Sequence, residues 1–375
     1  MINISYKYRI YPTESQKQFF EKQFGMCRFI YNYCLDLQIK EYSLTQKKIH
    51  KYELQKRITQ LKKTESYKWL REGHAQALNA ETEHLESAYV NFFKTKKGFP
   101  KFKSKHNNNK SYTIPQDTKL IDNKLYLPKI KDEVKIKLHR PIIGEIKTCT
   151  ITKTSTNKYY ISINLKVDKD YPKLKLIDES QAVGLDLGIK TFATLSDGTY
   201  IDNPKFLKKS LRKLKILSKR HSKKVKGSKN KEKSRLKLAL LHEKVTNQRK
   251  DFLHKTTKML VDNYDTICLE TLKAKNMMKN HKLAQALSDI SIGTFNTMID
   301  YKSKQQGVNI LRIGQFEPSS RLCSCGVINQ NLTLKDRTWT CSSCNTTHDR
   351  DVLASNNIKK FAFIKNNNTV GTTEI

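Results

Sequence analysis

Apolar and polar positions along the chain follow two different periods, which divide it into helical and strand-rich parts. Residues 2–11 alternate in the way a half-buried strand does. From Glu14 onward, apolar side chains recur every three or four residues, which predicts helices that continue to about Phe93. Two such stripes are interpreted as core: Phe20, Phe24, Cys27, Tyr31 and Cys34, and then Leu78, Thr82, Leu85, Tyr89 and Phe92.

Strand-like alternation returns between residues 111 and 170. It is clear in KLYLPKI, EVKIKL and KYYISINLKV, which are separated by Pro and Asn. This pattern predicts a β-rich domain that the strand at 2–11 could join.

A third pattern begins at residue 182, where AVGLDLGIKTFATLSDGTYI predicts two strands and a hairpin at Asp197-Gly198. Alternation in the first strand places Asp186 on one face among Ala182, Gly184 and Gly188. Neighbours this small are expected to leave room for a metal and a phosphate. A structural carboxylate in mid-strand would be costly unless paired, which favours a functional role for Asp186.

A short buried strand is predicted for DTICLE, residues 265–270, with Glu270 on the face opposite Ile267 and Leu269. One further helix is expected to run to about Gln306, followed by a strand at 308–314.

The charge is strongly positive, with 72 Lys and Arg against 35 Asp and Glu and a formal net charge of +37. Such a chain repels itself unless a polyanion neutralises it, and nucleic acid is the expected partner. No apolar run reaches the ~20 residues of a membrane span, and MINISYKYRIYP lacks the apolar stretch of a signal peptide. A cytoplasmic protein that binds no membrane is expected, and its eight cysteines are then thiols or metal ligands.

Basic residues are concentrated in two segments. KTKKGFPKFKSK, residues 94–105, has six lysines and no acid, and it is either a nucleic-acid contact or a solvated loop. Residues 205–237 hold sixteen Lys and Arg against one acid, and SKKVKGSKNKEK is read there as an exposed linker between two helices. The candidate nucleic-acid-binding residues are Lys101, Phe102, Lys103, Lys105, Lys208, Arg212, Lys215, Lys219 and Arg220.

Four cysteines near the C-terminus have metal-site spacing: Cys323, Cys325, Cys341 and Cys344. Zinc held by four thiols is the preferred interpretation. Only one residue separates Cys323 from Cys325, however, so three thiols with His348, or a weak site, stay open.

Four segments follow one another along the chain: GLDLGIKTFATLSDG, ICLETLKAKNMMKN, YKSKQQGVNILRIGQFEPSSRLCSCG and WTCSSCNTTHDRDVLASNNI. In this order they resemble the RuvC-like nuclease motifs of the TnpB family, RNA-guided DNA endonucleases encoded by transposons and related to type V CRISPR effectors. The segments YKYRIYPT and GFPKFKSK also resemble the family. The resemblance covers almost the whole chain.

The resemblance implies a multidomain α/β protein with a β-barrel, a helical lobe and an RNase H-like (RuvC) nuclease core containing an inserted zinc ribbon. The implied domains are a wedge-like β-barrel (1–12 and 101–181), a helical recognition lobe (13–100), the nuclease core (182–322 and 348–375) and the ribbon (323–347).

By the same resemblance, the catalytic carboxylates are Asp186, Glu270 and Asp351, which would hold two Mg²⁺ ions, while Zn²⁺ would occupy the ribbon. Asp349 is the competing third acid, and its alternative role is as an N-cap or salt-bridge partner for the helix that begins near Val352. The implied partners are a guide RNA from the same element and double-stranded target DNA flanked by a short motif.

Three features depart from the family pattern: the short first knuckle, Asn345 in place of Gly after the second knuckle, and Leu353 where the family usually has Asn. They are expected to affect the rigidity of the ribbon and the surroundings of Asp351. The main alternative function is an RNA-guided DNA-binding protein with weak or no cleavage. A zinc-ribbon scaffold would leave the three acids unexplained, and a DDE transposase fits the order of strands and ribbon less well.

Overall fold

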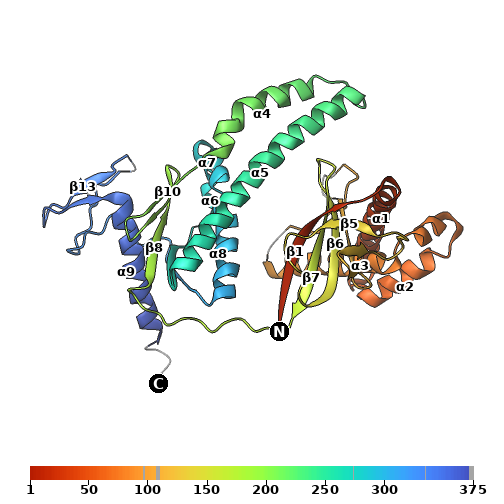
Figure 1. The fold of residues 1–375 in the computed structure, drawn as a ribbon, viewed down its shortest axis with the longest axis horizontal. Coiled ribbons are helices and arrows are strands. Elements are labelled where there is room, and N and C mark those ends of the chain that lie inside the picture. Colours follow the sequence, from red (N-terminus) through yellow and green to blue (C-terminus); the bar gives the residue numbers. More distant parts are fainter. Residues whose placement is uncertain (96–97, 107–109, 273, 334, 371–375) are drawn as a thin grey trace. The chain divides into compact units, whose positions relative to one another are not determined.

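The computed structural model describes residues 1–95, 98–106, 110–272, 274–333 and 335–370. The chain divides into two compact units, Met1–Asp170 and Tyr171–Ile375 (Figure 1).

The first unit contains a seven-stranded sheet in the order β2-β6-β7-β1-β5-β4-β3. Its strands are β1 (Ile2–Tyr11), β2 (Lys110–Ile114), β3 (Lys119–Ile121), β4 (Lys124–Tyr126), β5 (Val134–Lys137), β6 (Glu145–Lys153) and β7 (Tyr159–Val167). β1 pairs antiparallel with both β5 and β7, so the N-terminal strand does join the later strands. The order ends at β2 and β3, so over the described residues the expected barrel is an open sheet.

Helices α1 (Glu14–Thr45), α2 (Lys51–Leu61) and α3 (Ala75–Thr95), with the 3₁₀ helix η1 (Glu65–Glu72), form the helical part of this unit. The Thr13 side chain caps α1 by accepting a hydrogen bond from Gln16 N. Every residue of the first predicted stripe, from Phe20 to Cys34, is buried in one core with the inner face of the sheet. The first stripe is thereby confirmed as core.

The second unit is built on a five-stranded sheet in the order β10-β9-β8-β11-β12. The strands are β8 (Ala182–Leu187), β9 (Thr191–Leu195), β10 (Tyr200–Asp202), β11 (Thr266–Glu270) and β12 (Asn309–Ile313). β8, β11 and β12 run parallel, whereas β9 and β10 are antiparallel. The hairpin expected at Asp197-Gly198 is present, since Gly198 has a φ of 86° between β9 and β10.

Helices cover both faces of this sheet. α5 (Lys229–Asn263) and α8 (Ile292–Gln306) pack on one face, and α9 (Arg350–Val370) lies across the other (Figure 1). The parallel strands are buried on both faces, so β8 and β11 read as apolar runs. The small strands β13 (Thr338–Thr340) and β14 (Thr347–Asp349) precede α9.

Two predicted connections were wrong in detail. α4 (Phe206–Ser222) and α5 pair as a long hairpin, and α5 begins inside the stretch read as linker because the Ser228 hydroxyl accepts a hydrogen bond from Lys231 N. The single helix expected before Gln306 is divided into α6 (Ala274–Met277), α7 (His281–Ile290) and α8. Ser291 has a φ of 57°, which interrupts the helical path between the last two. No helix in the described part of the chain has the length and apolarity to cross a membrane.

Candidate catalytic centre and zinc ribbon

Two of the predicted acids lie near the carboxyl ends of two neighbouring parallel strands of the second sheet. Leu185 of β8 is in register with Leu269 of the parallel strand β11, so Asp186 and Glu270 follow at neighbouring positions. Carboxyl ends of parallel strands are where side chains from separate segments meet. The sheet topology therefore brings Asp186 and Glu270 together, although the sequence separates them widely.

The third acid comes from the start of α9. Asp349 Oδ1 accepts hydrogen bonds from the backbone N–H groups of Asp351 and Val352, both at 3.0 Å. These bonds satisfy two donors that a helix N-terminus otherwise leaves unpaired. The capping role considered for Asp349 is confirmed, and it fixes the backbone of Asp351.

The three acids share one electrostatic environment. Burial, and then the nearby charges of Glu270 and Asp351, together raise the pKa of Asp186 to about 7, against the opposing effect of Arg350 and Arg337. Asp186 is therefore exposed to the negative charge of both other acids. Their repulsion is the feature that a bound cation would relieve.

Each of the other two acids already has a partner. Glu270 accepts a hydrogen bond from the Ser319 hydroxyl at 2.6 Å. Arg337 Nη1 lies 3.3 Å from both carboxylate oxygens of Asp351. Across the described ranges, the only set of three or more possible metal ligands whose donor atoms lie within 4.8 Å of one another is the four ribbon cysteines. The carboxylates of Glu270 and Asp351 therefore act on Asp186 through their charge, and Arg337 is the cation in contact with Asp351.

The space expected beside Gly184 is filled by protein. A Cβ on Gly184 would lie 2.0 Å from the carbonyl oxygen of Ser355 and 2.9 Å from the backbone N of Lys359, both in α9. Asp186 projects from the same strand two positions further on, beyond this contact. The prediction that this row of small residues leaves room for a metal and a phosphate was thus wrong at Gly184, where the glycine allows α9 to approach β8.

The four cysteine sulfurs form a compact group. Cys323 Sγ lies 3.5 Å from Cys344 Sγ, and Cys325 Sγ lies 3.6 Å from Cys341 Sγ. A tetrahedral zinc site with bonds of about 2.3 Å places its sulfurs about 3.8 Å apart. Hydrogen bonds from the Thr346 side chain and backbone lower the pKa of Cys344 to about 6, which favours the thiolate that binds metal. The sulfur geometry and the lowered pKa of Cys344 therefore suit zinc.

The departures in the ribbon have local explanations. Asn345 has a φ of 53°, a left-handed conformation that Asn tolerates better than most residues other than Gly. The short first knuckle closes as a turn in which Gly326, with a φ of 93°, donates its N–H to the Cys323 carbonyl. Leu353 is buried in a small apolar cluster with Trp339 and Cys341. It therefore fastens α9 to the ribbon.

The first basic segment contains exposed side chains and one lysine that forms an ion pair within the protein. Lys101, Phe102 and Lys105 are exposed, whereas Lys103 Nζ lies 2.6 Å from Glu81 Oε2. Only 1% of the Glu81 side chain is exposed, and Lys103 also sits 4.0 Å from the centre of the Tyr31 ring. Lys103 therefore neutralises a buried carboxylate, which leaves it less available for phosphate than its neighbours.

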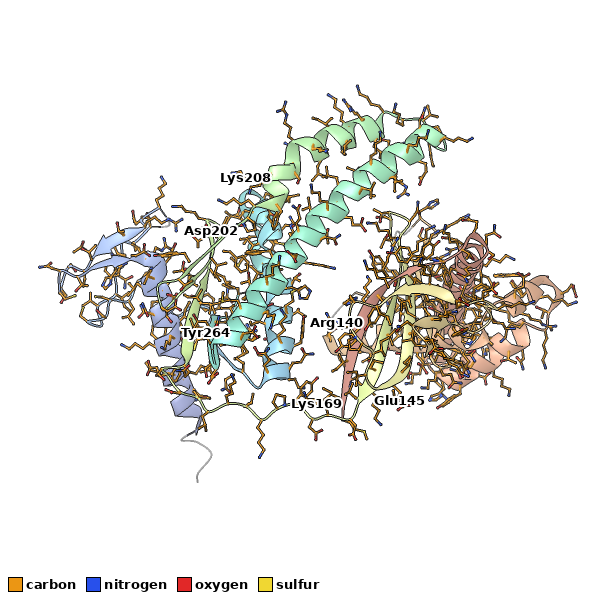
Figure 2. All side chains as sticks on the ribbon, viewed as in Figure 1. Arg140, Glu145, Lys169, Asp202, Lys208 and Tyr264 are labelled. Atoms are coloured by element: carbon orange, nitrogen blue, oxygen red, sulfur yellow. The ribbon has the colours of Figure 1, made fainter. Side chains whose placement is uncertain are left out.

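The second basic segment presents a continuous face on α4. Lys208, Arg212, Lys215 and Lys219 recur every three or four residues, and with Arg220 all are exposed. Figure 2 labels Lys208 near the start of the hairpin and shows nitrogen-tipped side chains projecting along both helices. The carboxylate of Asp289 fixes the start of α4 by accepting hydrogen bonds from the backbone N–H groups of Leu207 and Lys208. The hairpin thus holds a row of cations on a defined surface.

Three residues near the centre were missed by sequence reasoning. Besides Ser319 and Arg337, the buried Asn357 of α9 donates hydrogen bonds to the backbone carbonyls of Ser319 and Leu322. Asn357 ties α9 to the segment that enters the ribbon. A buried amide on the apolar side of a helix is the signal that could have identified it, whereas the partners of Ser319 and Arg337 depend on tertiary contacts.

Family profiles match three parts of the chain. A profile described as "Probable transposase" (OrfB_IS605) matches residues 162–281, one described as "Helix-turn-helix domain" matches 1–47, and one described as "Cas12f1-like, TNB domain" matches 293–358. In the structure, the 1–47 segment is the strand β1 followed by the long helix α1.

Full-length relatives are also found. A Streptomyces pristinaespiralis protein named as an RNA-guided DNA endonuclease is 34% identical over 94% of this chain and 88% of its own length. The similarly named InsQ of Escherichia coli K12 is 29% identical over 94% and 91%. Among solved structures, a Cas12f1–sgRNA–target DNA complex matches with a TM-score of 0.58 and 17% identity over 92% of this chain and 83% of that one. The fold is therefore that of a mixed α/β protein similar to Cas12 effectors.

Proposed function

The chain belongs to the TnpB family, and we propose on that basis that it is an RNA-guided DNA endonuclease that hydrolyses phosphodiester bonds at Asp186, Glu270 and Asp351. The observation that supports this proposal is the register of β8 with β11, which brings Asp186 and Glu270 to neighbouring positions, together with the charge of Asp351 of α9 acting on Asp186.

The donor set fits a hard cation. Carboxylate oxygens are the ligands that Mg²⁺ prefers, and Asp186, Glu270 and Asp351 would hold it. Bound magnesium would activate water and stabilise the charge that develops on the phosphate oxygens. The protein's own contribution is to fix the acids: Asp349 holds the backbone of Asp351, and Ser319 orients Glu270.

The four cysteines are proposed to hold Zn²⁺ and so to fold the ribbon that leads into α9. A segment with so small an apolar cluster has little core of its own. The proposed role of zinc is therefore structural, and no step of the chemistry takes place at the ribbon.

The proposed partners are a guide RNA encoded by the same element and a DNA duplex that it matches. The net charge of +37 and the exposed row on α4 provide the cations that nucleic-acid backbones require. Base pairing with the guide would select the target, so the protein needs few base contacts of its own. Binding without cleavage is the competing function, and the ion pair of Asp351 with Arg337 favours it if that pair persists with magnesium.

The test compares cleavage of a guide-matched duplex by wild type, Asp186→Ala and Asp202→Ala, each purified with its RNA, in magnesium. Asp202 is the control because it is an exposed carboxylate at the end of β10, in the same sheet (Figure 2). We expect Asp186→Ala to abolish cleavage and retain target binding, and Asp202→Ala to cut like wild type. If wild type binds the target and cuts no faster than Asp186→Ala, the nuclease proposal fails and binding alone remains.

A further inference from the structure

His348 lies beside the cysteine group without completing it. Its Nε2 is 3.0 Å from Cys323 Sγ, and Cys323 is only 1% exposed. The imidazole also packs against Trp339, its register partner across β13 and β14, with ring centroids 5.0 Å apart. The ring is thus held between the sulfur group and an apolar wall.

Four thiolates around one divalent ion leave an excess of negative charge, so each sulfur benefits from a hydrogen-bond donor. The Thr346 hydroxyl lies 3.3 Å from Cys344 Sγ, and backbone N–H groups of the second knuckle serve Cys341. Cys323 is buried and comes from the short first knuckle, where one residue separates it from Cys325. His348 Nε2 is the ring nitrogen placed to donate to Cys323.

We propose that His348 is a positioning residue that donates a hydrogen bond to the Cys323 thiolate and links the zinc site to the N-terminus of α9. The inference rests on the proposed zinc ribbon. His348 is not a fifth ligand or a replacement ligand, because the four sulfurs already lie at the separations of a complete tetrahedral site.

The link to the acids runs through consecutive residues. His348 precedes Asp349 in β14, and Asp349 caps α9 at the N–H of Asp351. Fixing the imidazole against Cys323 therefore fixes the strand that presents the cap. The metal site would in this way set the position of Asp351 without touching the substrate.

The test measures metal binding by full-length His348→Ala, His348→Gln and Thr347→Ala. Gln can still donate a hydrogen bond from its amide. Thr347→Ala is the matched control, since Thr347 is the neighbouring residue of β14 and bonds Thr340 across the two strands, away from the sulfurs. The readouts are zinc per chain, zinc affinity by chelator competition, and the absorption spectrum of the cobalt-substituted protein.

We expect all forms to bind one metal with a four-thiolate cobalt spectrum. His348→Ala should lose about 10- to 100-fold in zinc affinity, His348→Gln should recover most of it, and Thr347→Ala should match wild type. The proposal is overturned by unchanged affinity in His348→Ala, by a wild-type spectrum of three thiolates and one imidazole, or by no metal binding at all. A protein that shows the expected metal behaviour but cuts no DNA would refute the nuclease function and leave the role of His348 intact.

Discussion

Gly184→Ala tests the contact that joins the two elements carrying Asp186 and Asp351. The added Cβ would meet the Ser355 carbonyl oxygen at 2.0 Å, whereas real Cβ atoms essentially never come closer than 3.0 Å to such an atom. The gap must therefore open by about 1 Å, and backbone on both sides leaves no flexible side chain to absorb the change.

This displacement has two measurable costs. Overpacking of this kind costs about 1–3 kcal/mol, and in a unit of this size each kcal/mol lowers Tm by about 2–4 °C, so a fall of about 2–12 °C is expected. Because α9 carries Asp351, a shift of about 1 Å also misplaces a carboxylate that we propose to be catalytic, and a misplacement of this size can lower the cleavage rate about 100-fold. Target binding should change little, since the basic surface is untouched.

The assays are thermal unfolding of the full chain and single-turnover cleavage of a guide-matched duplex. Gly293→Ala is the control: Gly293 lies in α8 of the same unit, and nothing stands within 4 Å of a Cβ built there. Ala is also the better helix former. If Gly184→Ala melts and cuts like Gly293→Ala, α9 does not rest on β8 at Gly184 and this account of the centre is wrong.

Three further substitutions test other contacts. Leu353→Asn should destabilise the ribbon by about 2–3 kcal/mol, because it buries an amide in an apolar cluster. The variant should lose zinc to a chelator faster than wild type, and slower loss would contradict this expectation. Lys103→Ala should lower the stability of the first unit by about 1–3 kcal/mol in denaturant, since the buried Glu81 keeps only His84 beside it among the described residues. An unchanged denaturation midpoint would show that the Lys103–Glu81 pair contributes nothing. Asp186→Asn should raise the Tm of metal-free protein more at about pH 8 than at about pH 5. The pKa of Asp186 is about 7 in the folded state and near 4 in the unfolded state, so wild type loses stability as the pH rises from about 4 to about 7. An equal rise in Tm at about pH 5 and about pH 8 would show that the pKa of Asp186 is not raised.

Local sequence patterns were sufficient to predict an element where one of its faces packs against a single hydrophobic core. The stripe from Phe20 to Cys34 and the two faces of β8, with Leu185 in one core and Gly184 against α9, each depend on neighbours along the same element, so they could be predicted. What fills the space beside such a face depends on tertiary packing. Gly184 shows this: the sequence indicates that space is needed but not that a helix backbone takes it.

The chemistry at single positions divides in the same way. Asp349 as a cap follows from its place just before a helix, and the structure confirms it. Two ion pairs could not be predicted from the sequence: Lys103 with Glu81, and Arg337 with Asp351. The spacing of these residues along the chain matches no helix or strand period. From the sequence, Leu353 was expected to disturb the surroundings of Asp351. Its contact with the ribbon cluster could not be predicted from the sequence.

The central claim is that RNA selects the DNA that the three carboxylates cut. The most direct measurement replaces the target-matching segment of the bound RNA and follows magnesium-dependent cleavage of the old and new duplexes, in wild type and in Asp186→Ala. We expect wild-type cleavage to move to the new duplex, and we expect Asp186→Ala to bind the new duplex without cutting it. Cleavage that stays at the old sequence, or that persists in Asp186→Ala, would contradict the central claim.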